Sequence, residues 1–198
     1  MPKKMTSKAF FQLLRRRQSD NALAIDRRIE KAGLEEATVL MSDSSGFSRK
    51  THEYGVIQFL AVMTQCYDRL IPLLETRKGT CISNNADNIL ALFKDPKDAV
   101  QAAIDMHRWL ARRNEGLPER DQFNICVGIH HGPLVRLSDN VYGGTVNVAA
   151  KIGEDLAGKD EILVSHKVAK RLGKSFSVKY NRSTEIGGRT FELHRVHY

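Results

Sequence analysis

The alternation of hydrophobic and polar positions after residue 36 predicts a sheet covered by helices. Short apolar runs rich in β-branched residues predict strands, and apolar positions three or four residues apart predict helices. The expected strands are residues 37–41, 80–82, 89–93, 123–129 and 161–164, followed by two final strands. The expected helices are residues 55–77, a helix from Pro96 onward, residues 145–157, and a short helix capped by Ser165 that ends near Gly173. This mixture places the chain in the α/β or α+β class, with one layered sheet.

Two of these helices show clear apolar faces. In residues 55–77 the apolar stripe is Val56, Leu60, Met63, Tyr67, Leu70 and Leu74. Pro72 lies inside this helix, where we expect it to kink or loosen the last turns. Asp95 and Pro96 are a typical cap and first-turn proline for the next helix. Its expected buried face is Val100, Ala103, Ile104, His107 and Leu110.

Residues 1–36 form a basic segment with partial helical periodicity. They hold nine Lys and Arg and five Asp and Glu, so half of the chain's net charge of +8 lies there. The pattern predicts amphipathic helices that break near residues 19–21. A basic stripe can bind nucleic acid or an anionic membrane. We expect it instead to pack on its own domain or on a second copy. No nucleic-acid-binding motif is present, so no nucleic-acid partner is expected, while membrane association of the arm stays open.

Composition limits further which class of protein the chain can belong to. The chain has 198 residues, 41% hydrophobic and 27% charged, which suits one globular domain rather than a disordered protein. It has no apolar run long enough to span a membrane, and its N-terminus lacks the features of a signal peptide. The three cysteines, Cys66, Cys81 and Cys126, form no pair with metal-site spacing, so we expect free thiols. These features indicate a cytoplasmic protein.

Two carboxylates are the first candidates for chemistry. Asp43 follows an apolar strand directly, and Asp87 lies in the polar turn between two further strands. Such positions suit Mg²⁺, which takes one or two protein carboxylates and leaves room for phosphate and water. The turn Ser44, Ser45, Gly46 and Phe47 can also direct backbone N–H groups at a phosphate. On spacing alone, each aspartate is more often explained as a turn or cap residue than as a metal ligand.

Asn147 and Lys151 are the second candidates. They are four residues apart in a predicted helix and therefore share a face. An amide and a cation there could hold a ribose and a phosphate, or could be ordinary surface residues. His130 and His131 are adjacent on a strand and face opposite ways, so we interpret them as structural. The chain contains no P-loop, dinucleotide-binding, zinc-protease or nucleophile-elbow motif.

Five segments in order carry a more specific signal. They are residues Met41–Ser48, Ala86–Phe93, Val127–Gly132, Tyr142–Lys151 and Glu161–Ser165. Together they resemble the catalytic domain of the class III nucleotidyl cyclases, from about residue 37 to the C-terminus. The resemblance implies an α+β fold with a ferredoxin-like sheet, residues 37–198 as the catalytic domain, and residues 1–36 as a helical arm. It also implies head-to-tail homodimers with nucleotide sites at the interface.

The resemblance assigns roles to residues of this chain. The family's metal-binding carboxylates fall on Asp43 and Asp87, which would hold two Mg²⁺ or Mn²⁺ ions over a nucleoside triphosphate. The ribose 3′-hydroxyl would attack the α-phosphate, giving a 3′,5′-cyclic nucleotide and pyrophosphate. The family asparagine that orients the ribose falls on Asn147, supplied by the opposite subunit.

Three positions depart from the family pattern. Lys151 stands where the family has a transition-state arginine, so the charge is kept and the two-pronged donor is lost. Ser83 and Asn140 replace the pairs that recognise adenine or guanine. Stand-alone cyclases of bacterial antiphage defence, which make cyclic pyrimidine nucleotides, also depart there. The expected base is therefore open between a pyrimidine and ATP, and an inactive nucleotide-binding or dimerising module is the alternative. Candidates for the terminal phosphates are Arg49, Lys50, Lys179 and Arg189.

Overall fold

The fold is one mixed β-sheet with helices on both faces. The computed structural model describes residues 4–85 and 87–198, so Ala86, the first residue of the second family segment, lies outside the described residues. The sheet has the order β2-β3-β1-β4-β6-β8-β7, and β5 pairs with β4 beside this path. Among the described strands, β4 and β6 alone pair in parallel; the other pairs are antiparallel. The strands are β1 (Leu34–Ser44), β2 (Thr80–Ser83), β3 (Ile89–Phe93), β4 (Ile125–Arg136), β5 (Val141–Tyr142), β6 (Ile162–Ser165), β7 (Ser177–Ile186) and β8 (Arg189–His197).

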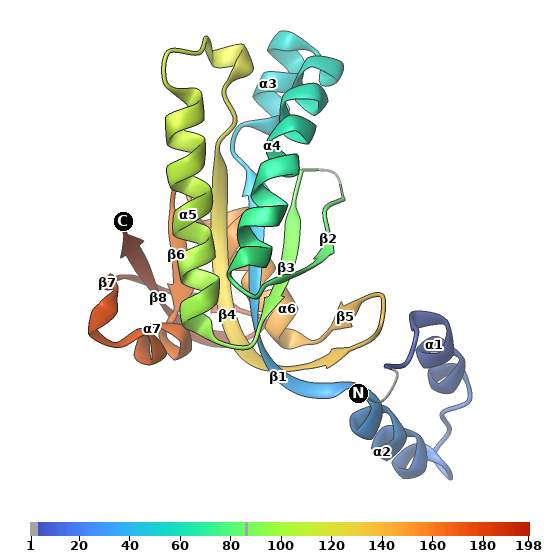
Figure 1. Ribbon diagram of the computed structural model, residues 1–198. Helices are drawn as coiled ribbons and strands as arrows, with labels where there is room; N and C mark the ends of the chain where they lie inside the picture. Colours follow the sequence, from blue (N-terminus) through green and yellow to red (C-terminus); the bar gives the residue numbers. More distant parts are fainter. Residues whose placement is uncertain (1–3, 86) are drawn as a thin grey trace.

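The helices form two unequal layers (Figure 1). The long helices α4 (Val56–Thr76) and α5 (Pro96–Asn114), with α7 (His166–Leu172), cover one face and bury the largest hydrophobic cluster. On the other face lies α6 (Gly144–Ala150), which continues into the π-helical segment η2 (Lys151–Leu156). The remaining helices are α1 (Ser7–Arg15), α2 (Ala22–Gly33), α3 (Phe47–Tyr54) and the 3₁₀ turns η1 (Glu119–Asp121) and η3 (Gly173–Ser175). The predicted α+β class is confirmed.

Strand alternation decides which residues face each layer. On β1, Leu40 belongs to the core under α4 and α5, whereas Val39 and Met41 pack on the α6 side. Asp43 continues the parity of Val39 and Met41, so it belongs to the α6 face of the sheet. The sheet thus directs this carboxylate away from the main core.

The N-terminus of α5 forms as its sequence predicts. Asp95 accepts a hydrogen bond from the Lys97 N–H, and Pro96 occupies the first turn. All five residues predicted to face inward are buried: Val100, Ala103, Ile104, His107 and Leu110. This helix is fixed by the local cap and by the spacing of its apolar residues together.

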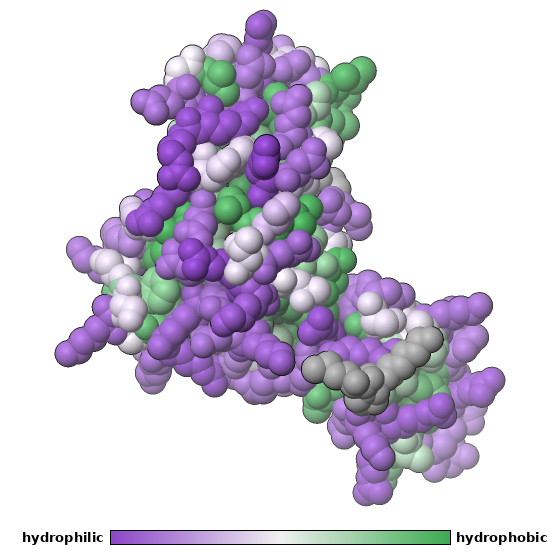
Figure 2. Space-filling view, viewed as in Figure 1, coloured by the Kyte–Doolittle hydropathy of each residue, from purple (hydrophilic) through white to green (hydrophobic). Residues whose placement is uncertain are grey.

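The long helix α4 corrects one prediction. It runs through Pro72 to Thr76, but its first turn is not buried: Val56 is 51% exposed and Leu60 39% exposed. Phe59 and Val62 are buried instead. The buried face is therefore rotated relative to the predicted stripe at this end, because α4 leaves the sheet there, and Figure 2 shows hydrophobic surface at that end of the molecule.

Other differences concern the ends of elements. β1 starts at Leu34 rather than residue 37 and extends to Ser44, so Asp43 is a strand residue rather than a turn residue. The sequence analysis also missed α3 and the two-residue strand β5. Ser165 occupies the residue before α7, but its side chain does not cap the helix; its hydroxyl is bonded to His130 Nδ1 at 2.7 Å.

The α6–η2 segment lies unusually close to the sheet at two glycines. A Cβ on Gly153 would lie 2.6 Å from the Met41 carbonyl oxygen and 3.0 Å from the Gly128 nitrogen. No side chain fits in that space, so this approach depends on both Gly128 and Gly153. It carries Glu154 and Asp155 to the edge where Asp43 lies.

The predicted break in the N-terminal arm is confirmed, with α1 and α2 separated at residues 16–21. The arm forms a lobe beside β5 (Figures 1 and 2). Its own small cluster contains Phe10 and Ile29 and packs on Leu137 of the β4–β5 hairpin. Ser7 donates from its N–H and its hydroxyl to Asp139 Oδ1, at 2.8 and 2.9 Å. The arm therefore packs on its own domain, and its residues 34–36 belong to β1.

The described residues contain no helix with the length and apolarity that a membrane crossing requires. Cys66, Cys81 and Cys126 are free thiols, as the sequence predicts. Burial raises the pKa of both the Cys66 and the Cys126 thiols to about 11, so both are protonated at neutral pH.

Candidate active site

The structure brings Asp43 and Asp87 together. Asp43 is the penultimate residue of β1, opposite Cys126 on β4. Asp87 lies in the β2–β3 turn, and its Oδ2 accepts a hydrogen bond of 2.8 Å from the hydroxyl of Ser44. The two carboxylates thus meet at one edge of the sheet although 43 residues separate them in sequence.

Negative charge dominates the surroundings of this pair. Burial, and then the charges of Asp87 and Glu154, raise the pKa of Asp43 to about 6. Neither Asp43 nor Asp87 forms an ion pair with a Lys or Arg among the described residues. Excess negative charge on oxygen ligands in a half-buried position fits a hard divalent cation such as Mg²⁺ or Mn²⁺.

A buried hydroxyl adjoins the pair. The Tyr67 hydroxyl, on α4, has no hydrogen-bond partner among the described residues. Burial raises the pKa of Tyr67, and the charges of Asp87 and Asp43 raise it further. Tyr67 is therefore protonated and can donate a hydrogen bond towards the acidic edge.

The Ser44–Phe47 turn links the carboxylates to α3. Gly46 has φ 85° and precedes the helix without a side-chain cap, so the first N–H groups of α3 lack such a partner. Phe47 anchors the turn by packing edge-on against Phe59 of α4, with ring centroids 5.0 Å apart. The Ser45 N–H already donates to the Asn124 carbonyl at 2.9 Å, so the donors that the turn can offer beside Asp43 are the uncapped N–H groups that begin α3.

Asn147 and Lys151 lie one helical turn apart and both are exposed. The Lys151 N–H still donates to the Asn147 carbonyl, so the spacing that puts them on one face holds at the start of η2. Lys151 Nζ forms an ion pair of 2.6 Å with Asp155. Its charge is therefore partly compensated within its own chain.

Asn147 opens onto a cavity of about 620 Å³ that the sequence analysis did not predict. Arg189, from the β7–β8 hairpin, and Lys167, from α7, line the same cavity. Of the candidates for phosphate contact, Arg189 is the one that shares a cavity with Asn147 among the described residues.

The other basic candidates have different surroundings. Lys50 is buried and donates to the carbonyls of Glu119 (3.1 Å) and Gln122 (2.5 Å), which ties α3 to the loop before β4. Arg49 is paired with Glu53 at 2.9 Å and with Glu119. Lys179 is exposed on β7. Lys50 therefore has a structural role and cannot reach a phosphate without losing these bonds.

The two groups of candidates lie at different positions along the sheet. Asp43 is opposite Cys126, whereas the cavity of Asn147 has Gly132 in its wall. Gly132 lies six positions beyond Cys126 on β4, about 20 Å along a strand, and His130, in the same wall, lies four positions beyond it, about 13 Å. The structure therefore does not bring Asn147 and the carboxylates to one point within a single chain.

Ser83 and Asn140 form no hydrogen bond with each other among the described residues. Both lie next to residues that line the same small cavity. Their neighbours Ile82 and Asp139 line a cavity of about 310 Å³. Asn140 Oδ1 accepts from the Val141 N–H, and Asn140 Nδ2 donates to the Tyr142 hydroxyl at 3.1 Å. The Asn140 amide is thus held by β5.

Sequence reasoning missed Glu154 and Asp155. The charge of Glu154 raises the pKa of Asp43, and Asp155 forms an ion pair with Lys151. Glu154 Oε1 also accepts from Asn88 Nδ2 at 2.9 Å, joining η2 to the β2–β3 turn. Their spacing from Lys151, within one helical turn, is the signal that could have identified them. His130 and His131 have separate partners, Ser165 and Thr38, which agrees with the structural roles expected of them.

Comparisons with known proteins place this arrangement in a family. Residues 29–197 match the model of the adenylate and guanylate cyclase catalytic domain. The chain is 30% identical over 136 residues to serine/threonine-protein kinase pkn2 of Myxococcus xanthus, covering 66% of this chain and 16% of that protein. It is 28% identical over 129 residues to putative adenylate cyclase 3 of Rhizobium meliloti (strain 1021), covering 65% of this chain and 22% of that protein. The matches thus span less than a quarter of either relative.

The fold agrees with a solved structure at lower sequence identity. The guanylyl cyclase Cya2 superposes with a TM-score of 0.73 at 22% identity, covering 83% of this chain and 93% of that chain. The family model covers the whole sheet and the α6–η2 segment. The chain therefore belongs to the adenylate and guanylate cyclase catalytic domain family, as its sequence motifs predict.

Proposed function

We propose that the chain is a nucleotidyl cyclase that converts a nucleoside triphosphate into a 3′,5′-cyclic nucleotide and pyrophosphate. The observation that carries the proposal is the Asp43–Asp87 pair, half-buried and without an ion-pair partner among the described residues. Family membership supports the same reaction class.

The carboxylates hold divalent cations in this proposal. When bound, two Mg²⁺ or Mn²⁺ ions would activate the ribose 3′-hydroxyl and neutralise charge on the leaving pyrophosphate. Asp43 and Asp87 bind and position them, while Ser44 fixes Asp87 through its 2.8 Å hydrogen bond. The N–H groups that begin α3 bind phosphate oxygens.

Asn147 and Lys151 act from a second copy of the chain. Within one chain Asn147 lies away from the carboxylates, and a head-to-tail pair would bring Asn147 and Lys151 to the nucleotide of the partner. Asn147 orients the ribose, and Lys151 balances the charge that develops on the α-phosphate. Arg189, in the cavity of Asn147, binds the terminal phosphates.

Ser83 and Asn140 recognise the base. A hydroxyl and an amide both donate and accept hydrogen bonds, so they fit the edges of several bases. One relative above is named an adenylate cyclase and one similar structure a guanylyl cyclase, so the comparisons do not indicate which base this chain recognises. The experiment therefore has to distinguish a pyrimidine substrate, UTP or CTP, from ATP.

One observation favours a second function, nucleotide binding without turnover. Lys151 replaces an arginine by a single ammonium, and that ammonium is paired with Asp155 at 2.6 Å. A module of this kind would bind nucleotide and dimerise, but would release it unchanged.

The test is a four-nucleotide assay. The purified full chain is incubated with ATP, GTP, CTP or UTP in turn, with Mg²⁺ or Mn²⁺, and products are identified by mass. We expect one dominant cyclic product that is lost in Asp43→Ala and after removal of divalent metal by a chelator. As a matched control, Asp20→Ala removes an exposed carboxylate of the arm and should leave product formation unchanged.

A cyclic product that persists in Asp43→Ala would contradict the assigned metal site. Saturable nucleotide binding with no product from any of the four would establish the second function instead. A dominant product makes Ser83 and Asn140 the first residues to exchange when testing base choice.

A further inference from the structure

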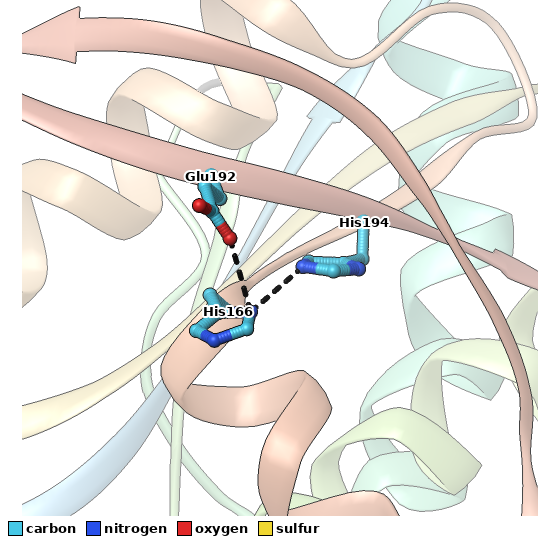
Figure 3. Close-up of side chains that lie close together, drawn as sticks. All are labelled: His166, Glu192 and His194. Atoms are coloured by element: carbon cyan, nitrogen blue, oxygen red, sulfur yellow. Dashed lines mark hydrogen bonds and ion pairs between the residues drawn. The ribbon is translucent and has the colours of Figure 1, made fainter.

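A second group of potential metal ligands lies away from the candidate active site. His166 is the first residue of α7, and Glu192 and His194 are two residues apart on β8. Figure 3 shows the three side chains directed towards one another, from the helix and from the strand. Within the part of the chain that the structure describes, no other three His, Cys, Asp or Glu side chains meet in this way.

The distances match a single small cation. His166 Nδ1 lies 3.0 Å from His194 Nε2 and 3.3 Å from Glu192 Oε2, and all three ligand atoms lie within 4.8 Å of one another. Ligands bound tetrahedrally at 2.0–2.1 Å from Zn²⁺ are about 3.3 Å apart. The group needs only a small adjustment of Glu192 or His194 to surround an ion.

The local packing holds both rings in place. The imidazoles of His166 and His194 stack with centroids 5.2 Å apart and an interplanar angle of 26°. Tyr180 of β7 packs edge-on against His194 at 5.9 Å. The side chains of His166 and Glu192 are 42% and 53% exposed, so an ion from solvent can reach them.

The cluster and the candidate active site occupy opposite faces of the sheet. Leu193 packs with Val148 and Ile152 on the α6 face, so its strand neighbours Glu192 and His194 point to the other face. Val196, which has their parity, lies in the core with Val168 of α7. The nucleotide chemistry therefore does not use this group.

We propose that His166, Glu192 and His194 form a binding site for Zn²⁺ or a similar late first-row divalent ion. Two imidazoles and one carboxylate are the donor set that favours such ions, whereas Mg²⁺ prefers oxygen alone. Three protein ligands leave the fourth position of a tetrahedral ion to water. Bound metal would tie the start of α7 to β8.

Binding requires one change of protonation within the cluster. The 3.0 Å contact between His166 Nδ1 and His194 Nε2 is a hydrogen bond, so one of these nitrogens carries a proton. The ion takes the lone pairs of both nitrogens. The displaced proton passes through water to the outer nitrogen of the same ring, which stays neutral, so no net proton is released.

The experiment measures Zn²⁺ affinity of the full chain by competition with a chromophoric chelator. Excess Mg²⁺ is present throughout so that it occupies Asp43 and Asp87. We expect one tight Zn²⁺ per chain, and Co²⁺ at the same site should give the intense visible absorption of a tetrahedral ion. Loss of a supporting group costs 10–100-fold in affinity, so His166→Gln or His194→Gln, which remove a ligand, should cost at least about 100-fold.

His197→Gln is the matched control, because His197 is an exposed histidine on the same strand. It should leave Zn²⁺ affinity unchanged. Glu192→Gln provides a variant at a half-exposed position that keeps the fold, and it should weaken binding while both histidines remain. Circular dichroism of each variant verifies folding, and Zn²⁺ should raise the melting temperature of the wild type but not of His166→Gln.

Equal Zn²⁺ affinity in the wild type, His166→Gln and Glu192→Gln would overturn the proposal. So would weak octahedral-type Co²⁺ absorption in the wild type. Neither result depends on nucleotide turnover, so the site stands or falls separately from the cyclase proposal.

Discussion

Asp43 combines two features that both favour its protonated form: its carboxylate is half-buried, and Asp87 and Glu154 add negative charge beside it. Burial first, and those charges second, raise its pKa from 3.8 to about 6. The folded chain therefore holds a proton on Asp43 more tightly than the unfolded chain does. Stability from this group is present below about pH 4 and falls as the pH rises through 6.

Asp43→Asn should accordingly stabilise the metal-free protein while removing its activity. At pH 7.5 in a chelator we expect the free energy of unfolding to rise by about 1–2 kcal/mol, a value reduced for the partial exposure of the group. The reason is that the amide removes the charge repulsion and keeps the shape. Urea denaturation at pH 7.5 and pH 4 measures it, and the gain should vanish at pH 4.

Magnesium supplies the control for this prediction. Saturating Mg²⁺ should raise the melting temperature of the wild type and have a much smaller effect on Asp43→Asn. A variant that is less stable than the wild type in the chelator at pH 7.5 would contradict this account of the acidic pair.

Among the secondary-structure elements, the junction of β4, β6 and α7 depends on a buried neutral histidine. His130 is bonded to Ser165 at 2.7 Å. Burial, and then the charges of Lys167 and His131, lower its pKa to about 4. Between about pH 6.5 and pH 4 the unfolded chain binds more protons at this position, so stability is lost as the pH falls through that window.

His130→Gln should therefore flatten the acid limb of the stability curve. The wild type should lose on the order of 2–3 kcal/mol from this group between pH 7 and pH 4, and the glutamine variant should not. Some dependence will remain, because burial also lowers the pKa of His107. Urea midpoints at several pH values measure the difference. The exposed His52→Gln should keep the wild-type slope, and an unchanged slope in His130→Gln would count against the assignment.

The contact of η2 with the sheet gives a second prediction for an element. Gly153→Ala places a methyl group 2.6 Å from the Met41 carbonyl oxygen, so η2 has to move away. Overpacking of this kind costs about 1–3 kcal/mol, and the displacement of Lys151 and Glu154 should lower turnover as well. Urea denaturation and the cyclase assay measure the two effects. Gly158→Ala, whose nearest neighbour would be Glu161 Oε2 at 3.6 Å, should change neither. Wild-type stability in Gly153→Ala would show that η2 can shift freely.

At the scale of the whole molecule, the separation along β4 makes one chain an incomplete catalyst under the proposed function. Asp43 and the cavity of Asn147 lie about 13–20 Å apart along the strand. Two inactive variants should therefore complement each other in a mixed dimer, because one of its two sites then has both residues.

An equal mixture of Asp43→Ala and Asn147→Ala, allowed to exchange subunits, should recover about a quarter of the wild-type activity. Half of the dimers are mixed, and each has one intact site of two. Cyclase activity before and after mixing measures the recovery. Asp43→Ala mixed with Asp87→Ala should stay inactive, because both changes affect the same half-site. No recovery in the first mixture, with subunit exchange demonstrated, would mean that Asn147 does not act across the interface.

The sequence predicted what depends on local patterns and missed what depends on distant contacts. Strand 89–93 and the capped start of α5 follow from their own residues. The length of β1 comes from pairing with β4 along its whole course, which no local pattern shows. Likewise Lys50, basic and near the phosphate turn, is fixed by carbonyls about 70 residues away. The motif residues Asp43 and Asp87 were identified through resemblance, and the environment that raises the pKa of Asp43 required the folded chain.

The contact between Gly128 and Gly153 also restricts how this sequence can drift over generations. Neither position can gain a side chain while η2 keeps its distance from β1 and β4, because the added carbon meets main-chain atoms that cannot rotate away. A substitution at one position therefore has no compensating change at the other. In descendants of this chain that keep the same helix–sheet distance, both positions stay glycine, whereas exposed Gly158, where an added carbon would meet only the Glu161 side chain at 3.6 Å, is free to vary.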